Sequence, residues 1–75
     1  MTPSMEDLKL LVGLLLGRQG VRPQDRLVED LGAESADLVN LVATVEEKYQ
    51  VELDEAAVAR VQTVADLYAL IVRRP

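Results

Sequence analysis

Residues 38–49 carry an apolar repeat that restricts the possible folds of this chain more than any other feature. Leucine, valine and tyrosine recur there at spacings of three and four, as Leu38, Leu41, Val42, Val45 and Tyr49. At about 100° per residue these side chains form one narrow stripe along a helix. The rest of the core must come mainly from Leu, Val and Ala, because the chain has two tyrosines and no Phe or Trp. This composition favours helix packing over a β-sandwich.

Three further helices are expected from capping patterns. Ser4 and Asp7 have the spacing of a capping box, and the helix that they open would end at Gly17. The residues expected on its buried face are Leu8, Leu11, Val12 and Leu15. A short helix over 55–60 would follow Asp54. The last helix would start from the capping box of Thr63 and Asp66, with Arg73 and Arg74 at its negative end.

The connection between the first two helices, residues 17–34, is long for so small a chain, and glycine and proline punctuate it. Its expected anchors are Val21, Leu27, Val28 and Leu31. We therefore expect an all-α fold. It would be a small four-helix bundle of three main helices and one short helix, with a long loop between helices 1 and 2. Residues 1–75 would form a single domain.

Composition excludes several classes of function. The chain has no Cys, so it offers neither disulfides nor thiolate metal ligands, and no His, the commonest general base and zinc ligand. We expect no metal site and no catalytic residue. A net charge of −5 argues against nucleic acid as a partner. The N-terminus does not resemble a secretory signal, and the longest uncharged run, 10–17, is too short for a membrane span. These features predict a cytoplasmic protein.

The segment GAESAD at 32–37 places Ser35 immediately before the apolar repeat. The simplest interpretation is that Ser35 is the N-cap of the helix. A catalytic serine would need an adjacent base, and neither a His nor a G-x-S-x-G elbow is present. If Ser35 takes part in chemistry, it is therefore as the substrate of another protein. A helix N-terminus tolerates an attached phosphate well.

The segment LVEDLGAESAD at 27–37 resembles FVEDLGADSLD, a common form of this stretch in acyl carrier proteins. The resemblance continues through LVNLVATVEEKYQVEL at 38–53 and VQTVADLYALI at 61–71, and covers roughly residues 5–72. It implies that Ser35 accepts 4′-phosphopantetheine from coenzyme A through a phosphopantetheinyl transferase. The thiol of that arm would carry acyl groups as thioesters between partner enzymes of fatty acid, lipid or polyketide biosynthesis. The chain would be a monomeric carrier and not an enzyme.

The resemblance also assigns residues around Ser35. Glu34 stands where the family usually has an Asp that helps to hold a metal ion during transfer of the arm, and Asp37 follows two residues after the serine. Both are expected to contribute to cofactor binding. The residues expected to dock acyl-transferring and acyl-modifying enzymes through their basic surfaces are Ala36, Asn40, Ala43 and Glu47. Ala36, Asn40 and Ala43 depart from the usual residues, which suggests a specialised carrier with its own partners.

Two alternatives stay open from the sequence. The chain could be an acidic helical interaction module without a cofactor, in which Ser35 is only a helix cap. It could also be a peptidyl or aminoacyl carrier, which shares the fold and the serine. Those carriers more often have Gly-Gly-His/Asp-Ser before a Leu, so GAES favours the acyl type.

Overall fold

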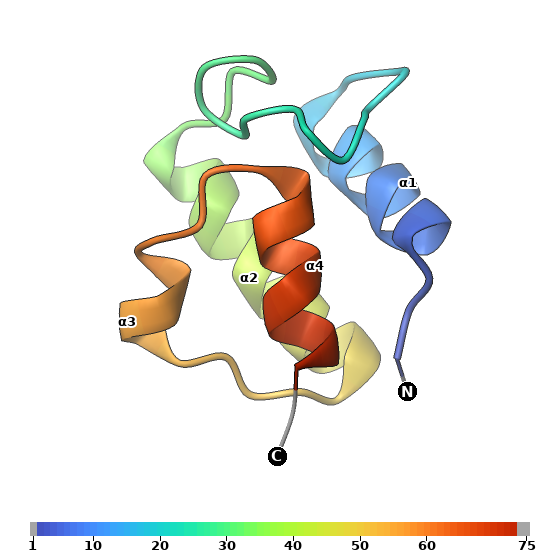
Figure 1. Ribbon diagram of the computed structural model, residues 1–75. Coiled ribbons are helices and arrows are strands. Elements are labelled where there is room, and N and C mark those ends of the chain that lie inside the picture. Colours follow the sequence, from blue (N-terminus) through green and yellow to red (C-terminus); the bar gives the residue numbers. More distant parts are fainter. Residues whose placement is uncertain (1, 74–75) are drawn as a thin grey trace.

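The expected helices are present, and a long loop closes one end of the bundle that they form (Figure 1). The computed structural model describes residues 2–73. Its helices are α1 (Met5–Leu16), α2 (Ser35–Tyr49), α3 (Glu55–Val58) and α4 (Val64–Val72). The fold is all-α, as the sequence predicts, and α3 ends at Val58 instead of continuing toward Arg60.

Three helices begin at the caps that the sequence indicates. The Ser4 hydroxyl accepts a hydrogen bond from the Asp7 N–H at 3.1 Å, and the Asp7 carboxylate accepts one from the Ser4 N–H at 3.2 Å. Thr63 and Asp66 make the same pair of bonds, both 3.0 Å long. Asp54 caps α3 through the Ala57 N–H. Arg73 is the C-cap of α4, whereas Arg74 lies outside the described residues. Local capping chemistry therefore sets these helix starts.

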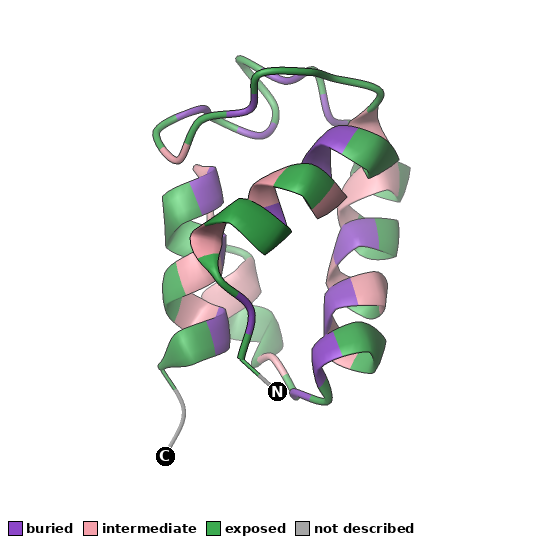
Figure 2. Cartoon of the chain, turned by 90° about the vertical axis from the view of Figure 1, so that its right-hand side faces the viewer, coloured by how far each residue is buried: buried purple, intermediate pink, exposed green. Residues whose placement is uncertain are grey.

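α1 runs toward the loop, and α2 and α4 run away from it (Figure 1). α1 contacts both α2 and α4, and α3 contacts α4. The buried faces of the helices point toward one another (Figure 2). The fully buried side chains that these contacts enclose are Leu8, Val12, Leu41, Val45, Val64, Leu67 and Ile71.

Two residues expected in the core, Leu15 and Val28, are exposed. Leu15 is 38% exposed, because the buried face of α1 follows Leu8 and Val12, and Leu15 lies at its edge. Val28 is 52% exposed. It lies in a helix-like turn in which Leu27 and Leu31, four residues apart, share the inward side. Residue 28 is rotated by about 100° from Leu27 in such a turn, which turns Val28 toward solvent.

The loop 17–34 is fastened to the start of α4 by backbone hydrogen bonds. The Val64 N–H donates to the Asp25 carbonyl at 3.0 Å, and the Ala65 N–H donates to the Pro23 carbonyl at 2.8 Å. The Leu27 N–H in turn donates to the Gln62 carbonyl at 2.8 Å. Two of the unpaired N–H groups at the start of α4 thus find acceptors in the loop. The loop behaves as part of the packed structure.

Asp25 is a buried carboxylate that the sequence did not single out. It accepts hydrogen bonds from the Arg22 backbone N–H at 2.9 Å and from the Arg22 Nε at 3.0 Å. The backbone bond, followed by the guanidinium, lowers the pKa of Asp25 in spite of the opposing effect of burial. This pair gives the first half of the loop a fixed conformation.

Candidate functional site

Ser35 is the first residue of α2 and is exposed at the end of the bundle that the loop covers. Glu34, one residue earlier, holds the N-cap position in an extended conformation. The Asp37 carboxylate accepts a hydrogen bond from the Glu34 N–H at 2.9 Å, which closes the first turn. Within residues 2–73, the Ser35 hydroxyl makes no hydrogen bond. The interpretation of Ser35 as the helix cap is therefore wrong, because the cap lies one residue earlier.

The backbone groups of the turn before Ser35 are hydrogen-bonded within the loop. The Ala33 N–H donates to the Leu27 carbonyl at 2.9 Å, and the Gly32 N–H donates to the Val28 carbonyl at 3.0 Å. Ala33 is buried, whereas Glu34 and Ser35 are exposed. Gly32 has a φ of +72°, a conformation that a residue with a Cβ rarely adopts. Ser35 therefore follows directly after a turn whose backbone conformation is defined by hydrogen bonds and by Gly32.

An ion pair stabilises the same turn from outside. The Arg26 backbone N–H donates to the Asp30 carboxylate at 2.7 Å, and the Arg26 Nε approaches the same oxygen at 3.2 Å. The Arg26 guanidinium, followed by its backbone N–H, lowers the pKa of the Asp30 carboxyl. Arg18 reaches the turn from α1 and donates its Nε–H to the Leu31 carbonyl at 3.2 Å. This contact of Arg18 cannot be predicted from the sequence, because nothing in the local pattern around Arg18 indicates it.

The surroundings of Ser35 suit a covalently attached phosphodiester. The hydroxyl is exposed and is not needed by the helix, and α2 has 15 residues whose backbone dipoles favour negative charge at this end. Within residues 2–73, no group of three or more carboxylates is arranged to hold a metal ion. Glu34 is exposed beside Ser35, where a carboxylate can supply one oxygen ligand to a metal ion held mainly by other molecules.

The residues expected to dock partners share the exposed face of α2. Ala36, Asn40, Ala43 and Glu47 are all exposed, and their spacing of three and four places them in one row. Glu46 has a different role. Its side chain accepts a hydrogen bond from the Leu53 N–H at 2.9 Å, which ties the end of α2 to the link before α3.

A groove of about 360 Å³ lies between α2 and α3. Its lining is mostly apolar and consists of Leu38, Val39, Val42, Ala43, Glu46, Leu53, Glu55 and Val58. A larger groove of about 680 Å³ lies along α1 and the start of the loop, from Glu6 to Val21. The groove beside α2 is more relevant to the site, because the same helix carries Ser35 at its start.

Comparison with known proteins identifies the family. The sequence matches the family described as "Phosphopantetheine attachment site" over residues 6–71. It is 35% identical over 68 residues to the acyl carrier protein of Wolinella succinogenes, and the match covers 88% of this chain and 90% of that protein. This chain belongs to the acyl carrier protein family. The acyl carrier protein of Chlamydia felis is also 35% identical, over 71 residues, 92% of this chain and 91% of that protein.

The fold of this carrier matches that of a solved structure from Mycobacterium tuberculosis assigned as an acyl carrier protein. The TM-score is 0.88, and the match covers 92% of this chain and 95% of the other at 23% identity. Acyl carrier proteins are carriers and not catalysts, and this carrier's cofactor is covalently bound 4′-phosphopantetheine. Family membership also argues against a helical module without a cofactor. No helix within residues 2–73 has the length and apolar character needed to cross a membrane.

Proposed function

We propose that Ser35 carries the 4′-phosphopantetheine of this acyl carrier protein, and that residues 1–75 act as one carrier domain. The observation that carries the proposal is that the Ser35 hydroxyl is exposed and has no structural role in capping α2. It is exposed at the start of a long helix, after a hydrogen-bonded turn, and does not cap that helix. A side chain in this position is accessible to another protein and can be modified without loss of a structural hydrogen bond.

The attachment is a phosphoryl transfer in which the Ser35 oxygen is the nucleophile. It attacks the phosphorus of coenzyme A on the pantetheine side of the pyrophosphate and forms a phosphodiester. The bond from this phosphorus to the bridging oxygen breaks, and 3′,5′-adenosine bisphosphate leaves. The hydroxyl proton passes to a base of the phosphopantetheinyl transferase, because this chain has no His. Once attached, the arm supplies a thiol for thioester chemistry that a chain without Cys lacks.

Two acidic neighbours would assist this step in different ways. The Glu34 carboxylate, exposed beside the serine, would contribute an oxygen ligand to the Mg²⁺ that neutralises the phosphates of coenzyme A. Asp37 would act through the backbone, because its carboxylate holds the Glu34 N–H at 2.9 Å and fixes the start of α2.

The exposed face of α2 is proposed to dock the partner enzymes. Besides the transferase, these are acyl-transferring and acyl-modifying enzymes of fatty acid, lipid or polyketide biosynthesis that bind a monomeric carrier. Asp37 and Glu47 would meet their basic surfaces. Small side chains at Ala36 and Ala43 leave these two exposed positions without large apolar anchors, which supports a specialised set of partners. Loading and processing at normal rates by general fatty-acid synthase enzymes would contradict that specialisation.

The groove between α2 and α3 is proposed to shelter the acyl chain. Its volume of about 360 Å³ lies within the range of small-molecule sites, and its lining is mainly aliphatic. The names of the relatives favour an acyl cargo over an aminoacyl one. In the acylated carrier, the methyl resonances of Val42 and Val58 are expected to shift relative to the unacylated form. Resonances unchanged by acylation would show that the chain stays outside the groove.

The experiment that tests the attachment site is intact mass spectrometry. The carrier is incubated with coenzyme A, Mg²⁺ and a broad-specificity phosphopantetheinyl transferase, and Ser35→Ala serves as control. We expect a gain of roughly 340 Da in the wild type and none in the variant. A gain that persists in Ser35→Ala would place the arm on another residue.

A further inference from the structure

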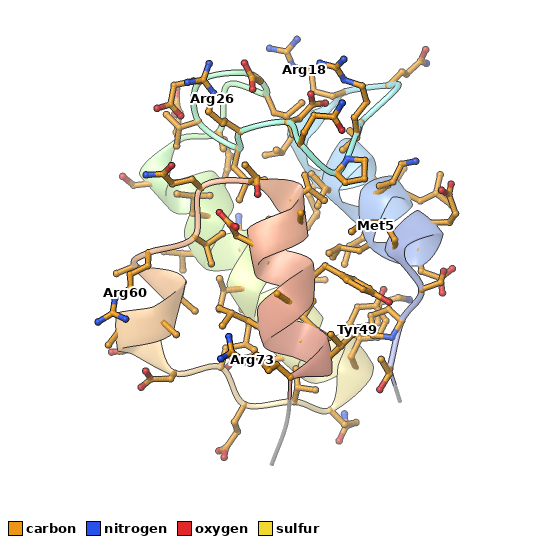
Figure 3. All side chains as sticks on the ribbon, in the orientation of Figure 1. Met5, Arg18, Arg26, Tyr49, Arg60 and Arg73 are labelled. Carbon is orange, nitrogen blue, oxygen red and sulfur yellow. The ribbon has the colours of Figure 1, made fainter. Side chains whose placement is uncertain are left out.

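Arg18 joins the end of α1 to the turn that precedes Ser35. Its backbone N–H donates to the Gly13 carbonyl at 2.9 Å, which fixes the residue just beyond the helix. Its side chain crosses to the turn, where Nε donates to the Leu31 carbonyl at 3.2 Å. Figure 3 shows Arg18 at the end of the molecule that the loop covers. One residue therefore links two segments that are 13 positions apart in the sequence.

Two glycines leave room for Arg18 along this path. A Cβ placed on Gly13 would lie 2.7 Å from the Arg18 carbonyl oxygen, closer than real Cβ atoms approach. A Cβ placed on Gly32 would lie 3.2 Å from the Arg18 Nη2. The glycine at the centre of α1, which weakens a helix, is thus explained by the close passage of Arg18. Gly13 thus leaves room for the backbone of Arg18, and Gly32 leaves room for its guanidinium.

The neighbouring arginines of the loop are used differently. Arg22 and Arg26 each pair with a carboxylate, that of Asp25 at 2.9 Å and that of Asp30 at 3.2 Å. Within residues 2–73, Arg18 makes no ion pair, and its side-chain hydrogen bond goes to a backbone carbonyl. The Arg18 guanidinium therefore restrains a main-chain carbonyl of the turn instead of pairing with a carboxylate.

The segment that Arg18 holds leads directly to the serine. Leu31 is buried, and its carbonyl belongs to the peptide that joins it to Gly32. Ala33 and Glu34 follow before the hydroxyl of Ser35. A change in the direction of this peptide would therefore move the nucleophile, and small misplacements of reacting groups slow a reaction markedly.

We propose that Arg18 is a positioning residue for the attachment of the arm. By binding the Leu31 carbonyl, it holds residues 32–34 in the conformation that presents the Ser35 hydroxyl to the transferase. The inference rests on the proposed modification of Ser35. It differs from simple attraction of coenzyme A by positive charge, because positioning changes the turnover of the bound complex, whereas attraction changes the binding of coenzyme A.

The test compares Arg18→Met with Arg73→Met, which removes the same charge near the opposite end of the molecule (Figure 3). Loading is followed by intact mass with the transferase and coenzyme A. For Arg18→Met we expect kcat to fall about tenfold with the KM for coenzyme A unchanged, since a charged hydrogen-bond donor to the turn is lost. Arg73→Met is expected to load at the wild-type rate. Loading of Arg18→Met at the rate of Arg73→Met, or a rise in the KM for coenzyme A at constant kcat, would overturn the proposal.

A second measurement does not depend on the transferase. Amide hydrogen exchange at Gly32 and Ala33 is expected to be about tenfold faster in Arg18→Met than in Arg73→Met, with no change in α3. Equal exchange in the two variants would refute the positioning role.

If Arg18→Met does not fold, the same measurements of kcat, of the KM for coenzyme A and of amide exchange are made on Arg18→Lys and compared with Arg73→Met. It keeps the charge but lacks the planar guanidinium, so we expect a fall in kcat of about threefold. Wild-type protein that is not loaded at Ser35 would overturn the proposed function. Wild-type protein that loads normally, with variants that load equally well, would overturn the role of Arg18 alone.

Discussion

Replacement of Ser35 by Ala should abolish attachment of the arm and leave the stability of the unmodified protein nearly unchanged. The hydroxyl makes no hydrogen bond within the described residues, so none is lost. Alanine also has a high helix propensity in the first turn. We expect the free energy of unfolding to change by less than about 0.5 kcal/mol. Thr63→Ala provides the contrast, because its hydroxyl accepts the Asp66 N–H at 3.0 Å. Loss of such a cap costs about 1 kcal/mol.

The two variants can be compared by urea unfolding followed by far-UV circular dichroism, with thermal unfolding in parallel. For a domain of this size, a cost of about 1 kcal/mol lowers Tm by about 4–8 °C. The slope of the urea dependence should be the same in all variants, so that the midpoints report stability alone. A loss of stability in Ser35→Ala equal to that in Thr63→Ala would show that the hydroxyl caps α2 in solution. The main observation behind the proposed attachment site would then fail.

Three further results are expected from unfolding measurements on single variants. Gly13→Ala should lower the free energy of unfolding by about 1 kcal/mol or more, in spite of the better helix propensity of alanine. The reason is that the new Cβ would lie 2.7 Å from the Arg18 carbonyl oxygen. A stabilised variant would contradict this packing. Val45 is fully buried, so Val45→Ala should lower the free energy of unfolding by about 2 kcal/mol. Val39 in the same helix is 68% exposed, so Val39→Ala should change it by less than about 0.5 kcal/mol. Similar losses in the two variants would contradict the orientation of α2. The pKa of Asp66 is lowered by hydrogen bonds from backbone N–H groups, of which the bond from Thr63 has the largest effect. The contribution of Asp66 to stability is therefore complete above the ordinary aspartate pKa and is lost as the pH falls through the lowered value. Urea midpoints across acidic pH should therefore fall less steeply in Asp66→Asn than in the wild type, and parallel profiles would exclude this role.

The helix starts and the type of fold could be predicted because they depend on neighbouring residues. Ser4, Asp54 and Thr63 cap the helices that follow them as predicted, since a cap bonds to an N–H only three residues away. For α2, the sequence predicts the cap at Ser35, one residue later than its position in the structure, Glu34. Glu34 and Ser35 are both polar and precede the same apolar stripe, and only the backbone conformation distinguishes the cap from the first helical residue.

Burial and long-range contacts could be predicted less well. The exposure of Leu15 and Val28 depends on which face of the segment meets the neighbouring helices, and sequence spacing does not determine this. The role of Gly13 and the contact between Arg18 and Leu31 depend on the path of the loop past the end of α1. In the candidate site, Ser35 and the exposed row on α2 followed from the resemblance and from helical periodicity, whereas Arg18 could not be found without the structure.

The backbone bonds between the loop and α4 also bear on how the protein folds and opens. They join Pro23, Asp25 and Leu27 to residues about 40 positions later in the chain. Forming them closes a long loop, and the conformational entropy of that loop is lost only when α4 docks. The loop and α4 should thus become ordered together, late in folding. In the native state, amides at both ends of this junction would exchange through one shared opening. The serine consequently sits on a part of the molecule that loosens only when the last helix does.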